Sequence, residues 1–576
     1  GIILTILTAV VVVFALARLG SDRKPSIGDN STLVLRLEGE FPERAPVELP
    51  IPFFEQKARP TMKDVWDVLR KASVDSRIKA VLIEPRGLAV GWGKLQEIRS
   101  GIEKVKKSGK PVIAHLEMPG TREYYLATAA DQIYMAPQEF LNLKGLRAEL
   151  VFFRRTMDKL GVQVEIEHAG KYKDFGDTFV RDKMSPETQE VYNSVLDDLY
   201  AHLTSTIAAA RKKTPEQVKA IIDEGPFLAK QAKEKGLIDD LLYDDQVLDL
   251  VKKRGKISEV KPVSLKTYAK IPASSLGIEG GSKIALVVGQ GGIVSGEVDE
   301  DDFTGDNDGI GSITFNKLLK QVSDDASVKG VIVRVDSPGG DAIASDAIWR
   351  AMSQLSRKKP TVISMSDVAA SGGYYIAMTG DEVVAYPGTV TGSIGVVYGK
   401  ANLRGLYDKI GITKDFLLRG RFANVDSDYF PLSDDGRKKL REGIDETYRT
   451  FVSRAANGRK RTFDQLEPLA QGRVWLGSQA KANGLVDELG GIDRAMEIIR
   501  AKAKLGAADK LTLVTYPPKR NVFEILLKET PDSIVESQLA AKARAWMRSH
   551  GLAEWQLRLW SQGGLLALMP YSLSIQ

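Results

Sequence analysis

The chain has no cysteine among its 576 residues, and it has only four histidines. The lack of cysteine excludes disulfide bonds, cysteine nucleophiles and cysteine-ligated metals. The histidines do not occur in a metal-ligand spacing such as His-Glu-x-x-His, so a zinc site is not expected. The net charge of +6 is spread without long basic runs, which argues against a nucleic-acid partner. We therefore expect a function that needs neither a metal nor a nucleic acid.

The chain contains two copies of one domain. Six segments of the first half recur in the second half in the same order, at an offset of about 250 residues. For example, Glu123-Tyr-Tyr-Leu-Ala returns as Gly373-Tyr-Tyr-Ile-Ala. A longer example, Gln231-Ala-Lys-Glu-Lys-Gly-Leu-Ile-Asp, returns as Gln479-Ala-Lys-Ala-Asn-Gly-Leu-Val-Asp. We interpret this pattern as a tandem duplication of a whole domain.

Each copy has the pattern of an α/β domain. Short apolar runs rich in β-branched residues, such as 80–83 and 112–114, alternate with helical patterns, such as 62–71 and 94–107. At about 230 residues, each copy is long enough to bury its own core. The predicted boundaries are an N-terminal domain at 30–255, a linker at 256–282, a C-terminal domain at 283–505 and a C-terminal extension at 506–576.

Both ends of the chain differ from the repeat. Residues 1–17 carry no charged side chain and are mostly Ile, Leu, Val and Ala, and Arg18 ends this run. As a helix the run is about 26 Å long, near the short limit for crossing a bilayer, so we predict an uncleaved membrane anchor over residues 1–20. The tail from Asn521 contains three tryptophans among leucines and arginines, which suits either an amphipathic membrane helix or ordinary packing.

Two glycine-rich motifs occur only in the second copy, Asp336-Ser-Pro-Gly-Gly-Asp341 and Ala369-Ala-Ser-Gly-Gly-Tyr374. Each follows a predicted strand and precedes a predicted helix, where glycines permit a tight turn and expose backbone N–H groups. Ser371 at such a turn is a candidate nucleophile, and the amides of Gly340 and Gly372 can hold a tetrahedral oxyanion. A role in helix packing alone would have preserved these motifs in both copies.

A serine nucleophile needs a base, and no histidine lies near Ser371 in the sequence, so a Ser-His-Asp triad lacks support. The first copy has Gly170-Lys-Tyr-Lys-Asp174 where the second has Gly420-Arg-Phe-Ala-Asn424. The position that matches Lys171 in the second copy is therefore also basic, whereas the position that matches Lys173 is alanine. Lys173 becomes a candidate base if burial lowers its pKa from about 10.4. The other candidates are Lys171, Lys183 and, as a fallback, His168.

Two acidic residues lie close to this candidate base. Asp174 follows Lys173 directly, and Asp177 is three residues further along. A carboxylate that points into the site would keep the lysine charged and unable to accept a proton. If the segment is a strand, alternation places Asp174 on the face opposite Lys173.

The motifs resemble those of the signal peptide peptidase A family in its long, two-domain form. The resemblance spans about Ser31 to Ala503 and rests on Ser337-Pro-Gly-Gly, Ala370-Ser-Gly-Gly-Tyr-Tyr, Thr391-Gly-Ser-Ile-Gly-Val and Tyr172-Lys173. It implies two tandem ClpP/crotonase-like domains and a Ser/Lys dyad that needs no cofactor. Carried over to this sequence, it makes Ser371 the nucleophile and Lys173 the general base. It also implies oxyanion amides at Gly340 and Gly372 and a hydrogen bond from Ser393 that orients the lysine amine.

The resemblance further implies a serine endopeptidase anchored in the bacterial inner membrane, with its catalytic domains on the periplasmic side. Its substrates would be cleaved signal peptides and other short hydrophobic peptides, bound in an extended form by strand addition. A homotetramer is implied as well. Because the serine and the lysine belong to different copies, we expect the site at a domain interface, within one protomer or between neighbours. The alternatives are a crotonase-like acyl-CoA enzyme, which would need an acidic catalytic pair, and a catalytically inactive membrane scaffold.

Overall fold

The computed structural model describes residues 27–45, 59–298, 309–518 and 565–569. The predicted anchor at residues 1–20 lies outside these ranges, as does most of the tail that follows Asn521. In the described ranges, no helix has the length and apolar character needed to cross a bilayer.

A parallel six-stranded sheet forms the core of the first domain, in the order β8-β4-β3-β2-β1-β9. Its central strands are buried on both faces, which is why they read as nearly continuous apolar runs. The strands are β1 (Ser31–Gly39), β2 (Ile78–Leu88), β3 (Val112–Leu116), β4 (Gln132–Met135), β8 (Asp240–Leu241) and β9 (Lys261–Ser264), with a separate pair, β5 (Phe140–Leu141) and β7 (Phe227–Leu228). The helices are α2 (Met62–Val74), α3 (Trp92–Lys107), α4 (Thr121–Ala127), α5 (Arg154–Leu160), α6 (Asp177–Val180), α7 (Pro186–Arg211), α8 (Pro215–Ile222), α9 (Ala229–Glu234), α10 (Asp244–Gly255) and α11 (Leu265–Ala269), followed by the 3-10 helix η1 (Ala273–Leu276).

The second domain repeats this sheet in the order β20-β16-β15-β13-β10-β21. Its strands are β10 (Ser282–Gln290), β13 (Val328–Ser337), β15 (Thr361–Ala370), β16 (Glu382–Ala385), β20 (Glu488–Leu489) and β21 (Leu511–Tyr516), with β17 (Val390–Gly392) and β19 (Val474–Leu476) added beyond the end of β15. The helices are α12 (Ser312–Asp324), α13 (Ala342–Lys358), α14 (Gly372–Ala377), α15 (Arg404–Ile410), α16 (Asp434–Gly458), α17 (Phe463–Leu466), α18 (Gly477–Asn483) and α19 (Ile492–Lys502), with the 3-10 helix η2 (Glu467–Leu469). The shared strand order confirms the prediction of two tandem α/β domains.

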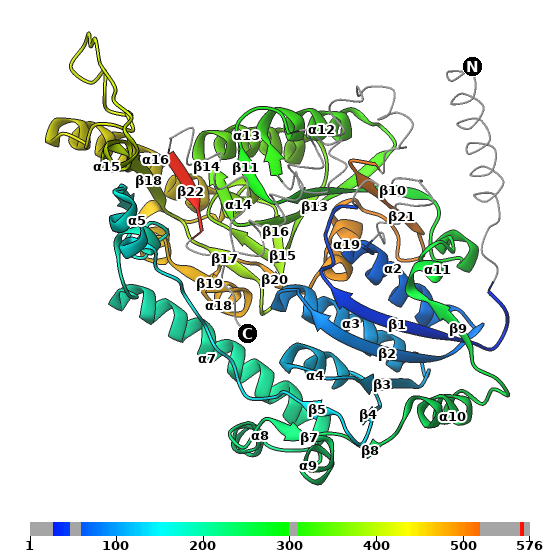
Figure 1. Ribbon diagram of the computed structural model, residues 1–576. Coiled ribbons are helices and arrows are strands. Elements are labelled where there is room, and N and C mark those ends of the chain that lie inside the picture. The colour runs from blue at the N-terminus through cyan, green and yellow to red at the C-terminus, as the bar shows by residue number, and fades with distance from the viewer. Residues whose placement is uncertain (1–26, 46–58, 299–308, 519–564, 570–576) are drawn as a thin grey trace, which may run out of the picture.

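A third sheet joins the two domains, in the order β12-β11-β14-β22-β18-β6. Only β6 (Gln163–Ala169) comes from the first copy, and it pairs antiparallel with β18 (Val396–Asn402) along its whole length. The remaining strands are β11 (Gly292–Val294), β12 (Gly309–Gly311), β14 (Gly339–Asp341) and β22 (Leu565–Leu568). Figure 1 shows β22, a short strand of the C-terminal tail, between β14 and β18.

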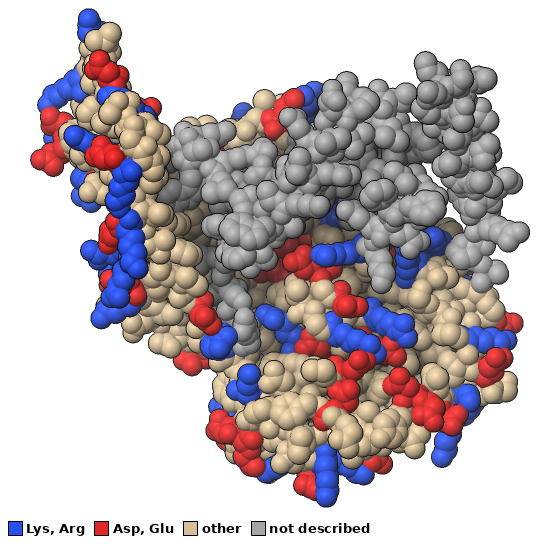
Figure 2. Space-filling view, viewed as in Figure 1, with Lys and Arg blue, Asp and Glu red and all other residues tan. Residues whose placement is uncertain are grey.

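Helices of the first domain also pack on the second domain. Trp66 of α2 lies in an apolar cluster with residues of the second sheet, and its indole N–H donates to Asp493 at 3.0 Å. Positive and negative side chains are interspersed over the face of the molecule shown in Figure 2. The contact between α2 and the second sheet is thus largely apolar.

Two edge strands lie beyond the predicted domain limits. β9 falls in the segment predicted as the linker at 256–282 and pairs with β1, and β21 falls in the predicted extension and pairs with β10. Each completes the same edge of its sheet. The first edge strand reads Lys-Pro-Val-Ser, with side chains that are largely exposed, so its composition resembles a loop.

Candidate active site

Strand β6 carries Lys173 out of the first domain and into the second. The chain turns sharply after the strand at Gly170, where φ is +110° and a Cβ would lie 2.6 Å from the carbonyl carbon of Gln471. The Tyr172 N–H then donates to the Gln471 carbonyl at 2.7 Å, which fixes the next residue. Lys173 therefore lies in a turn, not in the strand that would have placed Asp174 on its opposite face, and its side chain is fully buried.

Ser371 occupies the turn between β15 and α14. Its φ of +54° is in the left-handed region, which is unfavourable for a residue other than glycine and marks a position held by its surroundings. The Ser371 N–H donates to the Gly392 carbonyl at 2.8 Å, and the Ser371 carbonyl accepts from the Tyr375 N–H at 2.8 Å. The strained turn directs the hydroxyl away from its own strand and towards Lys173.

The serine and the lysine meet within one chain. Lys173 Nζ lies 2.7 Å from Ser371 Oγ, and it lies 2.8 Å from the carbonyl and 3.0 Å from the hydroxyl of Ser393. The side chains of all three residues are 0% exposed. Of the two arrangements that the sequence allowed, the structure has the one inside a single protomer.

Burial sets the protonation of this lysine. Desolvation lowers the pKa of Lys173 well below its ordinary value, and the charge of Asp174 opposes the shift. In the described part of the chain, Lys173 takes part in no ion pair within 4.0 Å. The lowered pKa favours the neutral amine, which is the form that a proton acceptor requires.

The two neighbouring carboxyl groups have partners of their own. Asp174 accepts a short hydrogen bond from Thr188 Oγ1 in the first turn of α7, and burial raises the pKa of Asp174 to about 6. Asp177 forms an ion pair with Arg181 at 2.7 Å. Neither carboxylate contacts the lysine amine directly, so the arrangement does not hold Lys173 in its charged form.

The other candidate bases lie elsewhere. His168 and Lys183 are exposed, and the Nδ1 atom of His168 lies 3.1 Å from the Gly170 carbonyl. Lys171 is also exposed, with its amine 3.3 Å from the hydroxyl of Tyr172. In the described structure, none of these side chains hydrogen-bonds to Ser371.

The predicted oxyanion amides flank the serine. Gly372 is the first residue of α14, where backbone N–H groups have no partner inside the helix. A Cβ on the neighbouring Gly339, where φ is +101°, would lie 2.7 Å from the Gly372 amide nitrogen and 3.0 Å from Ser371 Cβ. The Gly339–Gly340 turn is anchored by Asp341, whose carboxylate accepts from the Ala344 N–H at 2.7 Å and caps α13. Only glycine allows the turn to approach the serine so closely.

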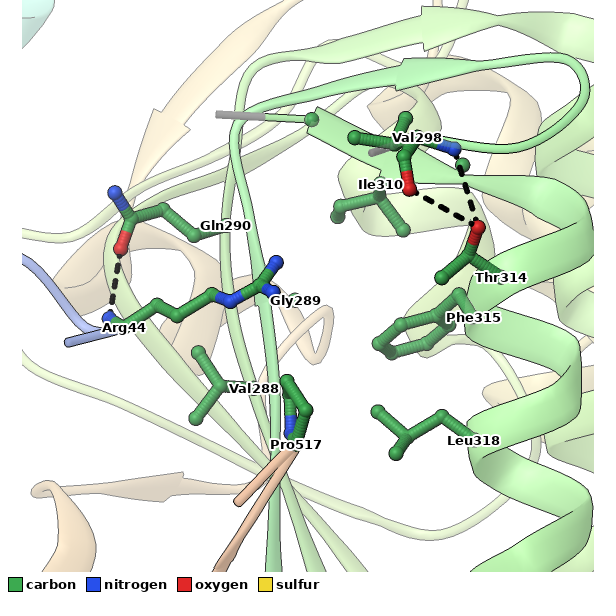
Figure 3. A pocket seen from close by; sticks show the side chains of 12 residues that line it. Arg44, Val288, Gly289, Gln290, Val298, Ile310, Thr314, Phe315, Leu318 and Pro517 are labelled. Carbon is green, nitrogen blue, oxygen red and sulfur yellow. Dashed lines mark hydrogen bonds between the residues drawn. The ribbon is translucent and has the colours of Figure 1, made fainter. Parts of the chain in front are cut away.

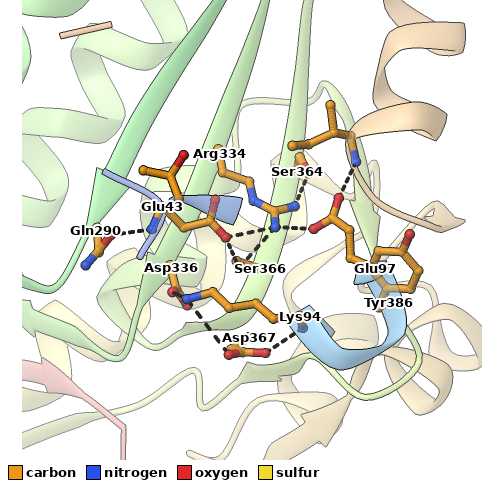
Figure 4. Close-up of polar contacts among 12 residues, drawn as sticks. Glu43, Lys94, Glu97, Gln290, Arg334, Asp336, Ser364, Ser366, Asp367 and Tyr386 are labelled. Atoms are coloured by element: carbon orange, nitrogen blue, oxygen red, sulfur yellow. Dashed lines mark hydrogen bonds and ion pairs between the residues drawn. The ribbon is translucent and has the colours of Figure 1, made fainter. Parts of the chain in front are cut away.

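A buried group of charged side chains lies at the ends of the strands that lead into these turns. The sequence analysis did not predict this group. Lys94 of the first domain pairs with Asp336 at 2.7 Å and lies 3.9 Å from Asp367 (Figure 4). Asp336 precedes the Ser-Pro-Gly-Gly motif, and Asp367 lies four residues before Ser371. The Asp336 carboxylate also accepts from the Val368 N–H at 3.1 Å, which ties the two motifs together. Burial raises the pKa of Asp367 to about 6, against the opposing charge of Lys94.

A second buried pair lies beside the first. Arg334 is 0% exposed and bonds to Glu43 at 2.9 Å and to Glu97, both from the first domain (Figure 4). Burial acts to raise the pKa of Glu43, but Arg334 and Lys94 outweigh it and lower that pKa. Burial raises the pKa of Glu97. These pairs join the first domain to β13 and β15, the strands that lead into the turns at Gly340 and Ser371.

Neither Ser371 nor Lys173 lines a separate cavity in the described structure. It is lined mainly by apolar residues of β10 and α12, with Gln290 accepting from the Arg44 N–H at 3.0 Å (Figure 3). Its volume of about 20 Å³ has room for roughly one water molecule, which is far too small for a peptide.

Comparison with known proteins finds similarity to peptidases. The sequence model of Peptidase family S49 matches residues 104–258 and 353–506, one match in each copy. A chloroplastic serine protease SPPA from Arabidopsis thaliana is 36% identical over 461 residues, covering 79% of this chain and 68% of that protein. Protease 4 from Salmonella typhi is 32% identical over 488 residues, covering 82% and 76%. Protease 4 from Haemophilus influenzae is 32% identical over 453 residues, covering 75% and 71%.

Proposed function

Since this chain belongs to Peptidase family S49 and is a serine protease of the long, two-domain form, we propose that Ser371 is its nucleophile and Lys173 its general base. The observation that carries the proposal is the 2.7 Å separation between Ser371 Oγ and a buried amine whose pKa is lowered. The acyl-CoA and inactive-scaffold alternatives find no support, because the matched family and the relatives reported above are peptidases.

In the proposed reaction, the neutral amine of Lys173 accepts the proton of Ser371 as Oγ attacks the scissile carbonyl carbon. The amides of Gly340 and Gly372 stabilise the oxyanion, where each donor is worth about 3 kcal/mol of barrier. Lys173 then gives the proton to the leaving amine, and the acyl-enzyme forms. Water, deprotonated by the same lysine, releases the acyl group. Ser393 holds the amine in position through its hydroxyl and its carbonyl.

We propose cleaved signal peptides and other short hydrophobic peptides as substrates. We also propose that the apolar run in residues 1–20 anchors the protein in the bacterial inner membrane, with both domains on the periplasmic side, and that the protein is a homotetramer. The apolar run and the family resemblance support these proposals. Extraction of membranes with carbonate, with a variant lacking residues 1–20 as the control, tests the anchor, and the mass of the detergent-solubilised protein tests the assembly.

A fluorophosphonate probe tests the proposed dyad. We expect the probe to label the wild-type protein and the Lys171→Ala variant, but not Ser371→Ala or Lys173→Ala. Lys171 is a matched control because it lies two residues from Lys173 and is exposed. Normal labelling of Lys173→Ala would show that another group activates the serine.

A further inference from the structure

The turn that carries Lys173 is held by one residue of the second domain, Gln471. This glutamine is half-buried and lies shortly before β19. Its main-chain carbonyl accepts from the Tyr172 N–H at 2.7 Å, and its side-chain Oε1 accepts from the Lys171 N–H at 3.0 Å. We propose that Gln471 is a positioning residue, which sets the place of Lys173 relative to Ser371 by holding the backbone of this turn.

Two hydrogen bonds to successive N–H groups fix the turn more firmly than one could. A single bond would let the turn rotate about the line that joins donor and acceptor, whereas two bonds to one residue fix its direction as well. The amine of Lys173 lies at the end of a long side chain, so a small rotation of the backbone displaces Nζ further than it displaces the turn. Nζ must stay within hydrogen-bond reach of Ser371 Oγ, which is 2.7 Å away. Misplacement of a reacting group by about 1 Å can cost roughly 100-fold in rate.

Close packing couples Lys173 to the same part of the second domain. Gly472, with φ of +75°, lies directly against the lysine, because a Cβ there would be 2.7 Å from Lys173 N and 2.8 Å from Lys173 Cα. A Cβ on Gly395 would in turn lie 2.9 Å from Gly472 Cα and 3.0 Å from Lys173 Cδ. Since only glycine allows these approaches, a shift of the segment that contains Gln471 would shift Lys173 with it.

The two residues that follow the glutamine fix the group that binds the lysine amine. The Gly472 N–H donates to the Ile394 carbonyl at 2.7 Å, and the Ser393 N–H donates to the Arg473 carbonyl at 2.7 Å. Ser393 contacts Lys173 Nζ through its carbonyl at 2.8 Å and its hydroxyl at 3.0 Å. The backbone of Lys173 and the residue that binds its amine are therefore held by three consecutive residues.

Gln471 is itself fixed by α16 and the short helix that follows it. Its φ of +53° is in the left-handed region, which is unfavourable for glutamine and needs support from neighbouring groups. Its N–H donates to the hydroxyl of Tyr448 in α16 at 3.1 Å. Its side-chain amide donates to the carboxylate of Glu467, which also accepts from the Tyr448 hydroxyl at 3.3 Å. With Nε2 bonded to Glu467, Oε1 is the atom that faces the lysine turn.

The corresponding segment of the first copy makes different contacts. Glu224-Gly225-Pro226 leads into β7, where the second copy has Gln471-Gly472-Arg473 before β19. A Cβ on the glycine of the first copy would meet the Leu143 carbonyl of its own domain, whereas one on the glycine of the second would meet Lys173 of the other domain. The glutamine thus belongs to the copy that receives the lysine turn, which is expected of a positioning role and not of a role in the shared fold.

This inference rests on the proposed function, since the residue that Gln471 places is the proposed base. Gln471→Met keeps the length of the side chain and removes its hydrogen bonds. We expect kcat to fall about tenfold to 100-fold, with KM within about twofold of the wild type. Labelling of Ser371 by a fluorophosphonate should slow as much as kcat does, because the serine is activated less well.

Gln479→Met is the matched control, because Gln479 is also a glutamine of the second domain that hydrogen-bonds to the first. Its Nε2 donates to the Ser194 carbonyl at 3.2 Å, and its Oε1 accepts from the Leu476 N–H at 3.1 Å. The melting temperatures of the two variants should fall by similar amounts, while Gln479→Met keeps the kcat of the wild type. If both variants lose kcat equally, or if Gln471→Met changes only KM, the inference is wrong.

An exchange of two side chains should rescue the activity. Gln471→Glu combined with Glu467→Gln keeps an oxygen that accepts from the Lys171 N–H, and it keeps the hydrogen bond between the two side chains. We expect this double variant to recover most of the kcat that Gln471→Met loses, each measured at its own pH of maximum activity because the exchange moves a negative charge. A double variant as slow as Gln471→Met would contradict the role of Oε1.

Tyr448→Phe tests the same contact if Gln471→Met does not fold. It keeps the ring and removes only the hydroxyl that accepts from the Gln471 N–H. Its kcat should fall by about threefold to tenfold, and a kcat equal to that of the wild type would overturn the inference.

The labelling rates separate this inference from the proposed function. If Lys173→Ala is not labelled but Gln471→Met is labelled at the wild-type rate, the positioning role is wrong and the proposed dyad stands. If Lys173→Ala is labelled like the wild type, the proposed function itself fails, and Gln471 has no base to place.

Discussion

The protonation of Lys173 should set the acid limb of the pH profile of kcat/KM. An ordinary lysine, with a pKa of about 10.4, has roughly one neutral amine in 2,500 at pH 7. In the structure, desolvation of the fully buried amine opposes its charged form, and Asp174 is the one neighbouring charge that favours it. Asp174→Asn removes that charge, and an asparagine oxygen can still accept the hydrogen bond from Thr188. We therefore expect the acid limb of this variant to move to lower pH.

The expected loss of activity in Lys173→Ala follows from the role of Lys173 as a general base. Loss of such a base costs typically 10²- to 10⁴-fold in rate, or about 3 to 5 kcal/mol, so kcat/KM of Lys173→Ala should fall by this amount. The assay is hydrolysis of a fluorogenic peptide between pH 5 and pH 10, with Lys171→Ala as the control. Each tenfold gain in neutral amine corresponds to one unit of pKa, or 1.36 kcal/mol.

Two results would refute this reasoning. The pKa of Asp174 is itself raised to about 6, so its carboxyl group is a competing origin for an acid limb. If the limb vanishes in Asp174→Asn, the carboxyl group controls the rate and Lys173 does not. If Lys173→Ala keeps its activity within about threefold of the wild type, less than the effect of a general base, the lysine is not the base.

Three further substitutions test the surroundings of the dyad. Ser393→Ala removes the hydroxyl at 3.0 Å from the Lys173 amine but leaves the contact with the residue 393 carbonyl, so kcat should fall about tenfold with little change in KM. A loss beyond 1,000-fold, about 4 kcal/mol, is more than one hydrogen bond can account for and would contradict this role. Gly339→Ala should abolish peptide hydrolysis, because a Cβ there would lie 2.7 Å from the Gly372 amide nitrogen and 3.0 Å from Ser371 Cβ. Gly380→Ala, with φ of +90° but no atom within 4 Å, should retain activity, and equal activity in both variants would contradict the close approach. Arg334→Gln leaves Glu43 buried without its cation and should cost about 3 to 5 kcal/mol of folding free energy at pH 7. Because folding lowers the pKa of Glu43, ionised Glu43 stabilises the folded protein at pH values above its ordinary pKa, and this stabilisation is lost as the pH falls. The difference in melting temperature between the wild type and Arg334→Gln should therefore narrow near pH 4. A difference that stays constant with pH would exclude the pairing.

The buried charged pairs of the domain interface could not be predicted from the sequence. Arg334 and Glu43 are separated by 291 positions, and Lys94 and Asp336 by 242. A charged residue in a sequence is normally assigned to the surface, because an isolated charge is too costly to bury. No periodicity or spacing indicates which distant partner makes that burial possible. These pairs became recognisable only when the packing of α3 on the second domain brought them together.

The sequence by itself determined the duplication, the α/β class and the copy-specific positions of Ser371 and Lys173. It could do so because both copies must bury the same apolar strands, so residues that differ between otherwise matching segments are not explained by folding. Tertiary structure alone decided that β6 leaves its own domain, that the turn after it brings Lys173 to the serine of the same chain, and that a short leucine-rich strand of the tail lies across them. Strand exchange and tail docking depend on backbone hydrogen bonds between distant segments, and these bonds form with almost any side chain, so they leave little trace in the order of residues.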